Sequence, residues 1–221
     1  MPSKTYDVDI VNTLLKVRSI MSLSLKPYHH GNLAEEILQR AAEIIDDEGI
    51  EALTFRGLAR DLGVSHGAPN RHFKDKKALL SALATTGWLS LRDATLQAAD
   101  KVQTDDPHRR LNAMGRGYMR WACDNKALFR ALYHPDVNRY ASTELSDAIS
   151  QFTDDVRRAV AATQADGRHP DVPLDVLNLF TNSVPAGAAM LLVDPLLQHN
   201  LRSDRELDAL IAQVINLVVP I

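Results

Sequence analysis

The chain has one cysteine, Cys123, among its 221 residues. A single thiol can form neither an internal disulfide nor a zinc site that needs several thiolates, and this cysteine usage fits a reducing compartment. The sequence therefore predicts no metal and no cofactor, and it favours a location in the cytoplasm.

Long apolar runs are also absent. Residues 184–193 form the longest apolar-leaning segment, well short of the ~20 residues that a membrane-spanning helix requires. The N-terminus lacks the continuous apolar core of a signal peptide. With 45% hydrophobic and 24% charged residues, the composition is that of an ordinary soluble globular protein, and no membrane partner is predicted.

Motifs of common enzyme classes are missing. None of the eight histidines forms an H-x-x-x-H or H-E-x-x-H pair, which would place two zinc ligands on one helix face. No P-loop, G-x-G-x-x-G or G-x-S-x-G motif occurs, so neither a phosphate-binding loop nor a nucleophile elbow is indicated. We therefore do not expect an enzyme.

Hairpin turn signals between alternating apolar runs are absent as well. Apolar residues instead recur at i, i+3 and i+4 almost throughout the chain. This periodicity predicts an all-α fold of about nine helices. The expected helices include 32–48, a long one from Lys76 to about residue 102, 142–165, 174–197 and a last one that Ser203 begins.

Residues 54–77 carry the most specific pattern, TFRGLARDLGVSHGAPNRHFKDKK. Thr54 can cap a short helix that Gly63 ends in a left-handed conformation, and Ser65 can cap a second helix over residues 66–73. Small residues at Ala59 and Gly63 let the two helices cross closely, as a helix-turn-helix requires. Residues 56–77 hold six Lys or Arg against two acids in a chain of formal charge −3, which indicates a surface for nucleic-acid phosphates.

With the preceding helix and the following KKALLSAL, this stretch resembles the DNA-binding domain of TetR-family transcriptional regulators over about residues 26–85. The resemblance rests on AAEIIDDEGIEALTFRGLARDLGVS, on RHF at the end of the second helix and on the Lys pair after it. KPYHHGNL and HGAPNRHF further resemble one subgroup of the family. The resemblance implies an N-terminal three-helix DNA-binding domain, 26–77, and a C-terminal helical ligand-binding and dimerisation domain, 78–221. Residues 1–25 are an extension, and translation that starts at Met21 is an open alternative.

The family resemblance assigns DNA contacts to individual residues. It implies base contacts from Arg56 and His66, with solvent exposure as the alternative, and Gly67 and Ala68 leave room to approach the groove, where Ala68 can touch a thymine methyl. Phosphate contacts are expected from the polar and basic residues of the same stretch, which are Thr54, Ser65, Asn70, His72, Lys74, Lys76 and Lys77. Arg71 belongs to the same predicted DNA-binding set.

Asn70, His72 and the segment before the first helix each need a further remark. The family usually has Tyr where Asn70 stands, so this side chain has a shorter reach to a phosphate. His72 can instead be packed and partly buried. Lys26, His29 and His30 form a basic arm that could reach the minor groove or remain a solvated tail.

Candidate effector contacts lie in the second domain and are aromatic, amide and Met side chains: Tyr118, Trp121, Phe129, Asn178, Asn182 and Met190. Plain core packing is the alternative for each. The polar side of helix 174–197, where Pro185 leaves the Thr181 carbonyl without its helical donor, is the expected effector site. Amide pairing across subunits is the alternative there.

A stripe of apolar residues on the last helix predicts a homodimer through an intermolecular four-helix bundle, together with the small residues Ala186, Gly187 and Ala189. Packing within its own subunit is the alternative. The stripe consists of Leu207, Leu210, Ile211, Val214, Ile215 and Val218.

The sequence thus predicts a repressor that binds double-stranded operator DNA as a homodimer and leaves it when a small-molecule effector binds, with the long helix from Lys76 moving the recognition helix. The alternative is a helical ligand-binding or interaction protein of the same fold with weak or lost operator binding. Asn70 is the only residue that favours this alternative.

Overall fold

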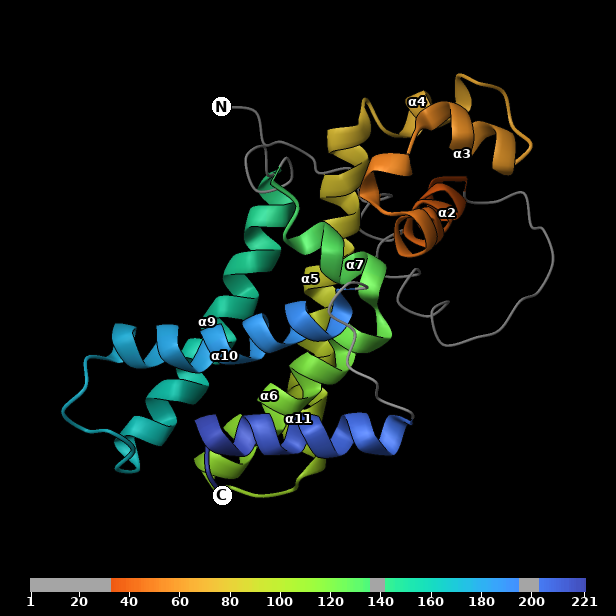
Figure 1. Cartoon of the computed structure of the whole chain (residues 1–221). Helices are drawn as coiled ribbons and strands as arrows, with labels where there is room; N and C mark the ends of the chain where they lie inside the picture. The colour runs from red at the N-terminus through yellow and green to blue at the C-terminus, as the bar shows by residue number, and fades with distance from the viewer. Residues whose placement is uncertain (1–32, 136–141, 195–202) are drawn as a thin grey trace, which may run out of the picture. The chain divides into compact units, whose positions relative to one another are not determined.

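The computed structural model describes residues 33–135, 142–194 and 203–221. These residues contain nine α-helices, one short 3-10 helix and no strand, which confirms the predicted all-α fold (Figure 1). The extension 1–25, the arm at Lys26, His29 and His30, and Asn32 lie outside the described residues. The elements are α2 (Leu33–Glu48), η1 (Ile50–Ala52), α3 (Phe55–Asp61), α4 (Ala68–His72), α5 (Lys76–Lys101), α6 (Pro107–Asp124), α7 (Lys126–Leu132), α9 (Thr143–Ala165), α10 (Leu174–Val193) and α11 (Asp204–Val218).

Contacts divide the chain into two compact units. Among the described residues, the first unit contains 33–87, 127–135 and 142–145, and the second contains 88–126, 146–194 and 203–221. α5 runs without a break from the first unit into the second. The first unit includes α7 in addition to the predicted DNA-binding domain, and the domain boundary after residue 77 stays a prediction.

α2 packs on α3 and α4 through its apolar face. Ile37, Leu38, Ala41 and Ile45 are buried, together with Ile44. The helix ends at Glu48 because Gly49 has a φ of +88°, which a residue with a side chain rarely adopts. α2 therefore supports the helices that follow it.

The first helix of the helix-turn-helix has the predicted ends. The Thr54 hydroxyl oxygen accepts the Gly57 N–H at 3.1 Å, which caps α3. Ala59 is fully buried, and Gly63 has a φ of +65°. The N–H of Val64 then donates to the Ala59 carbonyl at 2.9 Å, which closes the turn.

α4 is shorter than the predicted helix 66–73, since it covers only Ala68–His72. Ser65 was expected to cap it through the hydroxyl, and this was wrong: the Ser65 carbonyl accepts the Ala68 N–H at 2.9 Å, and no side chain caps the helix. Pro69 explains the late start, because a proline has no N–H and fits only the first turn of a helix. Residues 65–68 form a tight turn instead.

The core of the second unit forms where α10 and α11 pack on α6. Asp106 Oδ1 caps α6 by accepting the N–H groups of His108 at 2.8 Å and Arg109 at 3.2 Å. α6 approaches α5 closely at Gly117, where an added Cβ would lie 2.7 Å from the Ala98 Cβ. A glycine is required there for steric reasons.

Gly87 of α5 lies in close contact with α7. An added Cβ would lie 2.9 Å from Cδ2 of Leu132 in α7. Both residues belong to the first unit. The missing side chain therefore lets α7 pack tightly on the first half of α5.

α10 is the one described helix long and apolar enough, by length and composition alone, to cross a membrane, with a mean hydropathy of 1.5. The sequence prediction overlooked this because it counted only residues 184–193. A single such helix is weak evidence, since core helices of soluble proteins meet the same test. Polar Asn178, Thr181 and Asn182 interrupt the apolar surface of α10, and the helix packs on α6 and α11.

α11 has two apolar faces where the sequence predicted one stripe. Ile211, Ile215 and Val218 are buried within the second unit. Val214 is half-buried, and Leu217, which the prediction omitted, is 86% exposed. The apolar surface of α11 is therefore wider than its own unit covers.

Candidate nucleic-acid interface and effector cavity

The predicted DNA-binding residues lie on α3, on the turn and on α4, and most of them face solvent. Arg56, Asn70, Arg71 and His72 are exposed, so the buried alternative for His72 is not what the structure has. The turn residues Ser65 and His66 are exposed as well. Lys76, the first residue of α5, is half-buried. The segment therefore presents its polar and basic side chains outward.

Gly67 and Ala68 differ in what they offer to DNA. No atom lies within 4 Å of the position that a Cβ on Gly67 would take, so the turn is open there. Ala68 is only 9% exposed, and its methyl group packs inward. Ala68 therefore exposes little side-chain surface for the predicted contact with a thymine methyl.

The two predicted base-reading residues lie at one hollow of the first unit. Arg56 and His66 line it together with Thr54 and Arg60. One comes from the first turn of α3 and the other from the turn before α4, so the crossing of the two helices brings them together. The arrangement suits contact with adjacent base edges in a groove.

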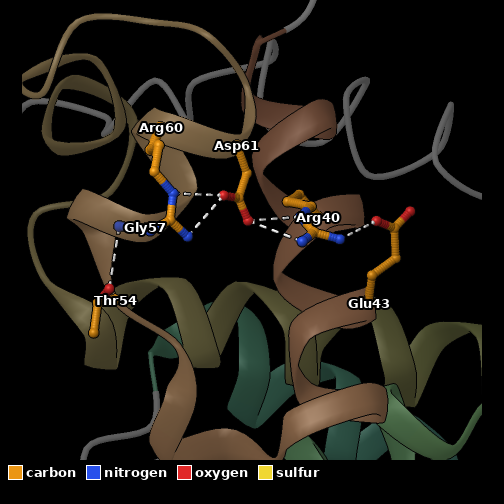
Figure 2. Close-up of polar contacts among 6 residues, drawn as sticks. All are labelled: Arg40, Glu43, Thr54, Gly57, Arg60 and Asp61. Atoms are coloured by element: carbon orange, nitrogen blue, oxygen red, sulfur yellow. Dashed lines mark hydrogen bonds and ion pairs between the residues drawn. The ribbon is translucent and has the colours of Figure 1, made fainter.

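Asp61 is the centre of a charge network that sequence reasoning missed (Figure 2). Its carboxylate accepts hydrogen bonds from Arg40 of α2, at 2.8 and 3.1 Å, and from Arg60, at 3.0 and 3.1 Å. Arg40 also pairs with Glu43 at 3.0 Å. Arg40, and then Arg60, lower the pKa of Asp61. Part of the predicted positive charge of the segment is thus neutralised locally at Arg60.

A second missed contact joins α7 to the end of α2. Arg130 donates to the carbonyl of Ile45 at 2.9 Å and lies 3.6 Å from the Asp46 carboxylate. The Ile45 carbonyl already accepts the Gly49 N–H at 3.1 Å, so the guanidinium is a second donor to it. Arg130 also donates to the Asp46 carbonyl at 3.3 Å, and its positive charge is favourable at the negative end of α2. α7 thereby fixes the helix on which α3 and α4 rest.

The second unit contains a cavity of about 40 Å³ between helices. Two of the six predicted effector contacts, Tyr118 and Asn182, line it. Thr181 and Pro185 line it as well, so Thr181 and Asn182 of the expected polar side of α10 face this cavity, whereas Asn178 does not line it. The remaining lining residues are mostly apolar: Thr95, Leu111, Met114, Gly115, Phe152, Val156, Ile215, Val218 and Val219.

The other four predicted effector contacts lie elsewhere. Trp121 donates its indole N–H to Ser90 at 2.9 Å and lines a separate surface depression. Phe129 belongs to the first unit, where its ring lies 5.1 Å from that of Tyr133.

Asn178 and Met190 lie on α10 but outside the cavity lining. Asn178 accepts two hydrogen bonds from the Asn182 amide, at 2.7 and 3.1 Å. Met190 is 42% exposed. Helical spacing alone could not separate these residues, because aromatic and Met side chains occupy core, surface and cavity positions alike.

Arg168 is a buried charge that the sequence pattern did not single out, since it lies in the loop before α10. It is 7% exposed. Its guanidinium donates to the Val218 carbonyl at 2.8 Å and to the Thr181 hydroxyl at 3.3 Å. Burial lowers the pKa of Arg168. Thr181 and Val218, its two partners, are both cavity-lining residues.

Comparison with known proteins finds similarity to tetracycline repressor proteins. The chain is 50% identical over 50 residues to the tetracycline repressor protein class C of Escherichia coli, which covers 23% of each protein. It is 32% identical over 110 residues, half of each protein, to the class D tetracycline repressor of Escherichia coli. The matches therefore span about a quarter to a half of the length of these curated relatives.

Solved structures match over most of the chain. A protein with unknown function from Rhodococcus sp. RHA1 shares 29% identity, with a TM-score of 0.67, over 88% of this chain and 100% of that one. A bacterial regulatory protein in the tetR family from Rhodococcus RHA1 shares 24% identity, also with a TM-score of 0.67, over 86% of this chain and 97% of that one.

Two family profiles match successive parts of the chain. Residues 37–83 match the profile described as bacterial regulatory proteins, tetR family, and this segment contains α3, the turn and α4. Residues 111–214 match the tetracyclin repressor-like C-terminal domain, which contains most of the cavity lining. The chain therefore belongs to the TetR family, with both the N-terminal helix-turn-helix domain and the C-terminal domain of that family.

Proposed function

We propose that this protein is a cytoplasmic transcriptional repressor that binds operator DNA as a homodimer and is released when a small-molecule effector enters the second unit. The observation that carries the proposal is the exposed set of Arg56, His66, Asn70 and Arg71 on a helix-turn-helix that matches the TetR family. The family and the fold are those of DNA-binding regulators. The subgroup suggested by KPYHHGNL and HGAPNRHF is part of the proposal.

DNA contacts divide into two kinds. Arg56 and His66, which line one hollow, are the candidates for base edges. Thr54, Ser65, Asn70, His72 and Lys76 are the candidates for phosphates, which position the domain without reading sequence. The Thr54 hydroxyl already accepts one hydrogen bond but can still donate its proton to a phosphate oxygen.

Coupling between effector and DNA follows from the continuity of α5. The helix begins at Lys76, a candidate phosphate contact, and carries Thr95 of the cavity lining about three quarters of the way along. A ligand that changes the packing around Thr95 therefore acts on the helix that also holds the DNA-binding end. A small change in the spacing of two recognition helices, which need ~34–36 Å to reach successive major grooves, lowers affinity.

Binding of the purified protein to fragments of its own upstream region, followed by fluorescence anisotropy at several salt concentrations, tests the proposal. Lys76→Ala should weaken binding to all sequences alike and reduce the slope of log K against log salt by about 0.9, the value for one lost phosphate contact. Arg56→Ala should flatten preference at one or two operator positions at a cost of about 1–3 kcal/mol.

The contradicting outcomes are distinct for the two variants. An unchanged salt slope would remove Lys76 from the interface, and uniform weakening across a randomised operator library would reassign Arg56 to the backbone. If no upstream fragment binds, the alternative of a helical ligand-binding protein with lost operator binding gains support. Asn70→Tyr then tests it, because the longer side chain should restore affinity only if the DNA-binding surface is otherwise intact.

A further inference from the structure

Arg168 is a buried guanidinium without an anionic partner among the described residues. Its two hydrogen bonds described above go to neutral oxygens, the Val218 carbonyl at 2.8 Å and the Thr181 hydroxyl at 3.3 Å. A buried charge is normally paired, because neutral acceptors replace only part of the hydration that the charge loses. The lowered pKa of Arg168, caused by burial, has the same origin.

One of the two hydrogen bonds has a structural explanation. Val218 is the last residue of α11, so its carbonyl has no helical donor, and a positive charge at this end is favourable. The bond to Thr181 serves no such need. Three other buried threonines, Thr85, Thr95 and Thr163, donate their hydroxyls to carbonyls of their own helix. Thr181 is instead the acceptor for a guanidinium.

The position of these partners relates Arg168 to the cavity. Thr181 of α10 and Val218 of α11 both line the cavity. The guanidinium is hydrogen-bonded to each of these two lining residues and so lies directly behind them. Most of the remaining wall is apolar. The cavity volume of about 40 Å³ corresponds to roughly three water molecules at ~10–15 Å³ each, the space of a carboxylate group.

We propose that the effector is an organic monocarboxylate with an apolar body, whose carboxylate pairs with Arg168 in place of the Thr181 hydroxyl. The apolar body lies among Leu111, Phe152 and Val156, and it needs α10 to move away from α6, since the cavity as it stands holds only the head group. A bidentate ion pair replaces one long hydrogen bond to a neutral acceptor, so the opposite charges favour the bound state. This inference rests on the proposed function, because it names the chemical class that the effector cavity takes.

The test compares each acid with its own neutral analogue. Hexanoate, octanoate and phenylacetate are titrated against hexanamide, octanamide and phenylacetamide by calorimetry and thermal shift. In the wild-type protein at least one acid should bind about tenfold or more tightly than its amide, as a charge-assisted hydrogen bond requires. If no acid exceeds its amide, the inference is overturned.

Variants assign the preference to Arg168. Arg168→Gln should abolish the preference for the acid, whereas Arg168→Lys should retain part of it. Arg116→Gln is the matched control, since Arg116 lies in the same unit but lines a different depression, and it should retain the full preference. A preference that survives in Arg168→Gln overturns the inference. If Arg168→Gln fails to fold, Thr181→Val keeps the α11 contact and leaves the guanidinium free, and it should tighten the acid but not the amide. An acid that binds Thr181→Val no more tightly than wild type then overturns the inference.

Operator release separates this inference from the proposed function. If the acids bind through Arg168 but do not release operator DNA, the carboxylate site stands and the proposed switch fails. If a neutral metabolite releases the operator equally from wild type and Arg168→Gln, the switch stands and the carboxylate inference fails.

Discussion

The outer face of α11 gives a direct test of the proposed homodimer. Leu217 is 86% exposed in the single chain, next to half-buried Val214, whereas Ile211 is only 2% exposed. Exposed apolar residues of α10, among them Leu179 and Phe180, add to the surface that a partner could cover. Leu217→Asp should therefore separate the subunits and leave each one folded.

The magnitude follows from burial. Covering a leucine side chain completely contributes about 1.5–3 kcal/mol, and a two-fold symmetric interface covers it twice, which makes about 3–6 kcal/mol. Since 1.4 kcal/mol is a factor of ten, the dimer Kd should rise by roughly 10²–10⁴-fold. Ile211→Asp places a charge inside the subunit and should lower the Tm of the subunit itself.

Sedimentation velocity over a range of protein concentrations measures the dimer, and circular dichroism measures the fold. Gln151→Asp, on the exposed side of α9, is the control for an added surface charge and should change neither. A folded Leu217→Asp dimer with the wild-type Kd would refute the assignment of the interface to this face. A folded dimer of Ile211→Asp would refute the assignment of Ile211 to the subunit core.

Two further changes test the packing of each unit. Asp61→Asn should lower the Tm at neutral pH. The difference in Tm from wild type should shrink as the pH falls through the lowered pKa of Asp61, because a carboxylate with a depressed pKa stabilises the fold only while it is ionised. The same substitution should free Arg60 and steepen the salt dependence of DNA binding, and an unchanged salt slope would contradict this release of Arg60. Gly117→Ala should lower the Tm of the second unit, since overpacking costs about 1–3 kcal/mol against about 1 kcal/mol gained in helix propensity. Adding Ala98→Gly should restore much of the loss, and a Gly117→Ala protein as stable as wild type would contradict the close approach.

The sequence by itself determined the features that local chemistry encodes. Thr54 caps α3 and Gly63 has the positive φ that ends it, because side-chain caps and left-handed glycines act within a few residues of the chain. The spacing of apolar residues likewise predicted the helices. Even the late start of α4 was encoded locally, in Pro69, although the Ser65 hydroxyl was wrongly expected to cap it.

Tertiary structure decided which side chains meet. Asp61 and Arg40 are 21 residues apart, and Arg168 and Val218 are 50 residues apart. Tyr118 lines the cavity while Phe129 packs in the other unit, although both are aromatic residues on apolar helix faces. Helical periodicity defines a face but does not specify what covers it, because coverage depends on how helices distant in the sequence pack. For the same reason, only the packed structure separates the two apolar faces of α11 and buries Arg168 beside the cavity.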